Sequence, residues 1–249
     1  GRYEVTNVTP KYIYDDRFLT LFPRMYSAQA KHVKEYKYWG KVVGKPIKAQ
    51  GRDGETKVMR VPTFGENLRF FFKYQIGHMY LRYFMWNFAG RQNDIQGHGD
   101  VLKGNWISGI PLIDDARLGP QDMLPESFKN NKANNKLYFL PLILGIMGIV
   151  YLYMRNRKDF WVVFLLFIFT GLAIVVYLNQ YPIQPRERDY AYAGSFYAFA
   201  IWIGLGVLWI YELLNKYLSQ KVSAVIATIA CFLLVPAHML SQNWDDHDR

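Results

Sequence analysis

The stretch 184–190 holds the residues whose types and spacing most favour chemistry. Four charges of alternating sign and a tyrosine stand in a row there: Arg186, Glu187, Arg188, Asp189 and Tyr190. The arginine guanidinium is a planar fork that matches phosphate oxygens. Because an uncharged run follows directly, the two arginines could hold the phosphate of a lipid headgroup at a membrane surface. The alternative is a self-neutralised cluster in which Glu187 and Asp189 are charge partners at a helix entry and Asp189 is the N-cap.

A second polar stretch, 90–100, is rich in glycine and contains His98 and Asp100. Two candidate ligands without a third do not make a metal site, so we predict no metal. The sequence also has no P-loop, dinucleotide fingerprint, nucleophile elbow or zinc-ligand pattern, and we predict no cofactor.

The distribution of charge identifies the environment of these stretches. The chain has 249 residues, 51% of them hydrophobic, with 30 Lys and Arg and 20 Asp and Glu. Residues 137–249 hold 15 of these charged residues, in short clusters separated by long uncharged runs. This pattern excludes a soluble globular domain and a disordered chain. A single cysteine, Cys231, excludes a disulfide scaffold.

Four uncharged runs of about 18 to 21 residues are each long enough to cross a hydrocarbon core as a helix. They are 137–154, 160–178, 191–211 and 222–240. In lipid a helix satisfies its own backbone polar groups, so these runs predict an all-α membrane protein whose four-helix transmembrane part covers 137–240.

Small residues predict where these helices approach one another closely. Ala191 with Ser195, and Ala200 with Gly204, form two small-xxx-small pairs on the third run. Three further glycines could do the same or could simply reflect the composition of membrane helices: Gly145, Gly148 and Gly171.

The other half of the chain divides by composition. Residues 1–67 are a basic, irregular or helical extramembrane segment. A lipid surface is a better partner for it than nucleic acid, and a plain solvated surface is favoured over both. Residues 68–90 are intensely aromatic yet contain Arg69 and Arg82, which predicts an interfacial or membrane-packed helix. Residues 91–136 form a polar outer loop region, and 241–249 start a following domain.

The first residue of the chain and the charges of its loops allow predictions about its extent and its orientation in the membrane. Because Gly1 opens the chain without a signal peptide, we interpret it as an internal piece of a longer membrane protein, with a processed short protein as the alternative. The two sides of the membrane carry similar numbers of basic residues, so the positive-inside rule does not decide the orientation. The short, almost purely basic turns near 155 and 216 favour the cytoplasm, which places 1–136 and 179–190 outside.

Three stretches, 80–94, 104–110 and 184–197, resemble one family. It comprises large polytopic inner-membrane proteins of Bacteroidota, assigned to a domain of unknown function (family 2723). That family is similar to transmembrane protein O-mannosyltransferases, the C-type glycosyltransferases.

The resemblance implies an integral-membrane glycosyltransferase that takes a polyprenyl-phosphate sugar and glycosylates protein hydroxyls on the outer face of the bacterial inner membrane. It implies that Arg186, Arg188 and Tyr190 bind the donor phosphate. A second polar patch would consist of Arg91, Asn93 and Asp94. The acidic motif that carries the catalytic acid in this class is absent from the sequence, so the catalytic residue is unknown. The alternative function is a non-enzymatic scaffold that binds other membrane subunits of an envelope complex.

Overall fold

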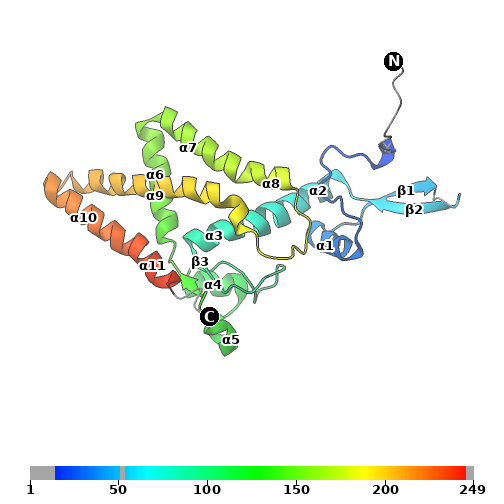
Figure 1. Cartoon of the computed structure of the whole chain (residues 1–249), viewed down its shortest axis with the longest axis horizontal. Helices are drawn as coiled ribbons and strands as arrows, with labels where there is room; N and C mark the ends of the chain where they lie inside the picture. The colour runs from blue at the N-terminus through cyan, green and yellow to red at the C-terminus, as the bar shows by residue number, and fades with distance from the viewer. Residues whose placement is uncertain (1–14, 51–53, 245–249) are drawn as a thin grey trace, which may run out of the picture. The chain divides into compact units, whose positions relative to one another are not determined.

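The computed structural model describes residues 15–50 and 54–244 and is mostly helical (Figure 1). It divides into two compact units, Gly1–Lys73 and Tyr74–Arg249. Two antiparallel two-stranded sheets correct the prediction of an all-α fold. Their strands are β1 (Lys45–Gln50), β2 (Thr56–Val61), β3 (Gly90–Arg91) and β4 (Asn135–Lys136).

The described part of the first unit contains short helices and a β-hairpin. The helices are η1 (Asp16–Phe18), α1 (Ala30–Gly40) and α2 (Phe64–Phe70). In the hairpin, Lys45 pairs with Val61 and Gln50 pairs with Thr56.

The side chains of the N-cap Thr63 and of Glu66 in α2 hold parts of the first unit together. Thr63 and Glu66 form a capping box at the start of α2, which satisfies backbone N–H groups that the first turn leaves without partners. Glu66 Oε1 also accepts the backbone N–H groups of Val43, at 2.7 Å, and Gly44, at 3.1 Å. A single carboxylate therefore joins α2 to the segment before β1.

The second unit contains the longer helices. After η2 (Phe71–Leu81) come α3 (Arg82–Phe88), α4 (Pro111–Leu118), η3 (Gln121–Met123) and α5 (Glu126–Lys129). The apolar half contains α6 (Leu140–Arg155), α7 (Arg157–Thr170), α8 (Leu172–Leu178), η4 (Asp189–Tyr192), α9 (Ala193–Leu214), α10 (Gln220–Phe232), η5 (Leu233–Ala237) and α11 (His238–Asn243).

Helix α9 is the centre of the second unit, because α6, α7 and α10 all pack against it (Figure 1). A buried cluster joins Phe84 and Phe88 of α3 to Leu152 of α6 and to Phe199 and Trp202 of α9. Two aromatic residues of α3 are therefore packed against α6 and α9.

Among the residues that the structure describes, three helical stretches are long and apolar enough to cross a membrane: Arg157–Leu178, Asp189–Leu214 and Gln220–Asn243. They contain three of the four predicted runs. The prediction of four spans is not confirmed, because α6 has 16 residues and extends only about 24 Å.

The first predicted run is shortened by its own first three residues. The backbone N–H of Leu137 donates to Ala89 O and that of Tyr138 to Ser108 O, both at 2.9 Å, so these residues continue the β4 pairing. Phe139 then adopts a left-handed conformation with φ of 58°. Tyr138 likewise has a positive φ, of 51°. Because a right-handed helix requires negative φ, the helix begins only at Leu140.

The close approach of α6 and α9 occurs at glycines. A Cβ added to Gly148 would lie 2.6 Å from the carbonyl carbon of Trp202, and one added to Gly145 would overlap the ring of Phe199. The small-residue prediction is wrong for Ala200 and Gly204, which are both exposed. At Gly204 an added Cβ meets no described atom within 4 Å.

Candidate functional site

The loop 179–188 contains Arg186, Glu187 and Arg188 and directly precedes η4. Residues of η2 anchor its beginning. Gln75 Nε2 donates to Asn179 Oδ1 at 3.0 Å and to Gln180 O at 2.9 Å. The Tyr74 hydroxyl donates to Tyr181 O at 3.2 Å. Because Gln75 is 1% exposed, these bonds form away from solvent and fix the path of the loop.

Glu187 fixes the end of the loop through a largely buried ion pair. Arg82 Nη2 lies 2.8 Å from Glu187 Oε2, and the side chains are 5% and 20% exposed. The Tyr83 hydroxyl also donates to Glu187 Oε2, and the backbone N–H of Gly97 donates to Oε1 at 3.3 Å. Glu187 thus pairs with a residue of α3 and not with its arginine neighbours, so the charges of Arg186 and Arg188 are not cancelled by it.

Tyr83 connects the ion pair to Arg188. Burial raises the pKa of the Tyr83 hydroxyl above its ordinary value, and the neighbouring Glu187 carboxylate acts in the same direction. The hydroxyl therefore keeps its proton and donates it to Glu187, while its oxygen accepts the backbone N–H of Arg188 at 3.1 Å. This arrangement fixes the main chain of Arg188 directly before the helix.

The two arginines of the loop differ in their surroundings. Arg188 Nε is buried, and within residues 15–50 and 54–244 it has no hydrogen-bond acceptor. Arg186 is exposed, lies over the Tyr190 ring at 5.4 Å from its centroid, and donates from Nη2 to the Tyr190 hydroxyl at 3.4 Å. A buried guanidinium N–H without an acceptor is costly, so Arg188 is the stronger candidate for binding an anion.

Asp189 is not the N-cap that the sequence suggested, because the N-cap of η4 is Arg188 and Asp189 lies in the first turn. Its side chain lines a cavity of about 250 Å³. The lining residues come from α3, β3, β4, the residue that follows β4, η4 and α11. They are Trp86, Asn87, Arg91, Asn135, Leu137, Asp189, Met239 and Asn243. The structure thus brings Arg91 of the predicted second patch beside the charged helix start.

The other members of the second patch do not join this cavity. Asn93 is fully buried, and its side chain accepts the backbone N–H of Gly104 at 2.9 Å and donates to Leu102 O at 2.9 Å. Asp94 is exposed and accepts a hydrogen bond from Asn131 at 2.9 Å. Asn93 therefore shapes the loop that follows β3.

His98 and Asp100 are both exposed, and Asp100 accepts the backbone N–H of Leu102 at 3.0 Å. In the part of the chain that the structure describes, no three His, Cys, Asp or Glu residues are grouped to hold a metal ion.

Sequence reasoning missed Arg82, Tyr83 and Trp86 as parts of this site. Trp86 is 8% exposed, lines the cavity, and its indole N–H has no acceptor among the described residues. One signal in the sequence could have found Arg82: it lies in a strongly aromatic helix, which predicts that its side chain is buried. A buried arginine requires an acidic partner. Nothing in the sequence identified Glu187 as that partner.

Comparison with known proteins gives a match in the first unit only. Residues 1–72 match a family of unknown function (DUF8416). The match ends at residue 72, one residue before the end of the first compact unit. The loop 184–190 and its cavity therefore lie outside the match. No curated protein and no solved structure matches the chain.

Proposed function

We propose that the chain is a segment of an integral-membrane glycosyltransferase, and that the loop 184–190 binds the phosphate of its polyprenyl-phosphate sugar donor. The observation that carries this proposal is the buried Nε of Arg188, which has no acceptor among the described residues. It stands at the start of a helix that is apolar enough to cross a membrane. A lipid phosphate supplies both the missing acceptor and a negative charge that the helix N-terminus favours.

The proposed step is a simple displacement. An acceptor hydroxyl oxygen of a protein bonds to the anomeric carbon, the bond from that carbon to the phosphate oxygen breaks, and the phosphate retains the electron pair. A carboxylate outside this segment takes the hydroxyl proton. Arg188 and Arg186 stabilise the charge that develops on the departing phosphate, and Tyr190 orients Arg186 by the contact described above.

The proposed topology places four helices across the bacterial inner membrane, with α6 as a short fourth span. The loop 179–188 and the residues 90–139 lie on one side, because Gln96 Nε2 donates to Gln184 O at 2.6 Å and Gly97 contacts Glu187. The turns after α6 and α9 lie on the other side. We place the loop 179–188 at the outer face.

The test is the replacement of Arg188 by Gln in the full-length protein. Binding of undecaprenyl phosphate in detergent micelles should weaken by roughly 10- to 100-fold, because a charge-assisted hydrogen bond is lost. The double variant R186Q/R188Q should lose sugar transfer while still inserting into the membrane. Arg157→Gln is the matched control, since Arg157 is exposed at the opposite end of the helices.

Three results would contradict the proposal. The first is unchanged glycosylation by R186Q/R188Q. The second is equal binding of undecaprenol and undecaprenyl phosphate, which would show that the phosphate is not recognised. The third is a stoichiometric membrane assembly that forms without any dependence on the lipid phosphate, which would favour the scaffold function.

A further inference from the structure

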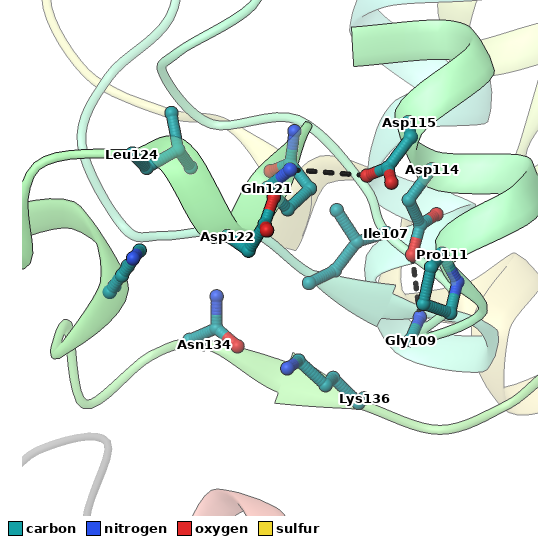
Figure 2. Close-up of a pocket in the computed structure, with 11 residues that line it drawn as sticks. Ile107, Gly109, Pro111, Asp114, Asp115, Gln121, Asp122, Leu124, Asn134 and Lys136 are labelled. Atoms are coloured by element: carbon teal, nitrogen blue, oxygen red, sulfur yellow. Dashed lines mark hydrogen bonds between the residues drawn. The ribbon is translucent and has the colours of Figure 1, made fainter. Parts of the chain in front are cut away.

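A larger cavity of about 530 Å³ lies between α4, η3, α5 and β4 (Figure 2). Its volume falls within the range of roughly 300 to 1,000 Å³ that is usual for small-molecule sites. Charged, amide and apolar side chains line it: Ile107, Gly109, Pro111, Asp114, Asp115, Gln121, Asp122, Leu124, Lys129, Asn134 and Lys136. All of these residues belong to the second unit.

One wall of this cavity is held rigidly by Asp114. Its Oδ1 accepts the backbone N–H of Ser108 at 2.8 Å and its Oδ2 accepts that of Gly109 at 2.8 Å. Asp115 Oδ1 accepts the backbone N–H of Gln121 at 3.1 Å, which joins α4 to η3. The wall is thus preformed, and Asp114 has no further role as a free charge.

Charges of opposite sign face the same space without pairing. Figure 2 shows Asp115 and Asp122 coming from α4 and η3, and Lys136 from β4. Lys129 of α5 adds a second ammonium group to the lining. Within the described ranges, none of these four side chains forms an ion pair with another. The cavity therefore has carboxylates and ammonium groups that can be contacted separately.

The strand β4 separates this cavity from the one beside Asp189. Side chains of an extended segment alternate between its two faces. Asn134 and Lys136 line the larger cavity, whereas Asn135 and Leu137 line the smaller one. The larger cavity is therefore a distinct site, and a ligand in it does not touch the residues of the proposed donor-phosphate site.

We infer that this cavity binds a short zwitterionic peptide, whose ammonium end lies against Asp122 and Asp115 and whose carboxylate end lies against Lys136 and Lys129. The Oδ1 of Asn134 can accept a peptide N–H, since its Nδ2 is already engaged by Gln92 O at 2.9 Å. Ile107, Leu124 and Pro111 provide apolar surface for small side chains. This inference does not depend on the proposed glycosyltransferase function.

The balance of charges argues against other ligand classes. A phosphate would meet the carboxylates as well as the lysines, and a divalent cation would meet the lysines. Asp122, Lys129 and Lys136 are exposed, so a neutral sugar would gain nothing from their charges. A ligand that carries both charges can contact the carboxylates and the ammonium groups at once.

The test measures binding of the tripeptide Ala-Ala-Ala to the full chain in detergent micelles by saturation-transfer NMR and calorimetry. Acetylation of the peptide N-terminus or amidation of its C-terminus should each weaken binding by roughly three- to tenfold, and added salt should weaken binding of the free peptide. Asp122→Asn should reduce the difference between free and acetylated peptides, and the double variant D115N/D122N should remove it. Lys136→Gln should reduce the difference between free and amidated peptides, and K129Q/K136Q should remove it.

The controls keep this inference separate from the proposed function. Glu126→Gln and Lys103→Gln change exposed charges outside the cavity lining and should leave peptide binding unchanged, as should Arg188→Gln. Absence of peptide binding at 10 mM, equal binding of the doubly blocked peptide, or preferential binding of glucose or inorganic phosphate would overturn the inference.

Discussion

The contact between α6 and α9 gives the sharpest prediction, because it depends on the absence of one side chain. A Cβ at Gly148 would lie 2.6 Å from the Trp202 carbonyl carbon, 2.9 Å from Gly206 N, and closer still to the Trp202 carbonyl oxygen. All three are backbone atoms, so no side-chain rotation relieves the overlap. In Gly148→Ala the two helices must separate by roughly 1 Å or more, and a gap of that size forfeits up to about half of the dispersion energy of the contacting atoms.

We expect Gly148→Ala to lower the free energy of unfolding by about 3 kcal/mol, at the upper end of the cost of overpacking. Dispersion is the main attraction between helices in a membrane, because lipid offers no hydrophobic driving force between them. The assay is reversible unfolding in mixed detergent micelles with increasing dodecyl sulfate, followed by circular dichroism. Gly204→Ala is the matched control, since an added Cβ there meets no described atom within 4 Å. Equal stability of the two variants would refute the close packing of α6 on α9.

Two further predictions concern buried carboxylates. Burial alone would raise the pKa of Glu66, but backbone N–H groups, including those of Val43 and Gly44, outweigh it and lower the pKa to about 2. The resulting stabilisation of about 3 kcal/mol is complete above the pKa of the unfolded state, near 4.5, and is lost as the pH falls towards 2. Amide exchange at Val43 should therefore be faster in Glu66→Gln than in the wild type at pH 7, and the two should be similar near pH 2. Replacing Glu187 with Met should cost roughly 3 to 5 kcal/mol by leaving Arg82 buried without its partner. Thermal unfolding should show the double variant R82M/E187M to be more stable than E187M, and the opposite order would contradict the buried ion pair.

Hydropathy predicted the three described helices that are long and apolar enough to cross a membrane, because length and lack of charge are properties of a continuous stretch. The residues at which these helices begin and end were harder to predict. Helix α7 begins at Arg157, before the uncharged run, because Asn156 caps it by accepting the N–H groups of Lys158 and Asp159. Helix α6 begins later than its uncharged run, because Leu137 and Tyr138 bond to Ala89 and Ser108, and Tyr138 and Phe139 then have positive φ. Such distant backbone partners leave no local pattern in the sequence.

The same distinction applies to the candidate site. The sequence identified the charged row before α9, because alternating charges next to an uncharged run are a local pattern. It could not show that Glu187 pairs with Arg82, which is 105 residues away. Nor could it show that Gly206, not Gly204, faces α6, because both positions are glycine and only the rotation of α9 decides between them.

The contrast between Arg82 and Arg188 explains why the charged row favours a ligand. Arg82 donates to His78 O at 2.9 Å, to Gly104 O at 2.7 Å and to both oxygens of Glu187, so its buried guanidinium is satisfied and it acts as a brace. Because Arg82 takes the Glu187 carboxylate, Arg188 does not pair with it and has a buried N–H without a described acceptor. An arrangement that served only to neutralise the loop would have paired Glu187 with Arg188. The pairing with α3 instead leaves a positive group at the start of a helix that is apolar enough to cross a membrane, which supports the proposed binding of a lipid phosphate.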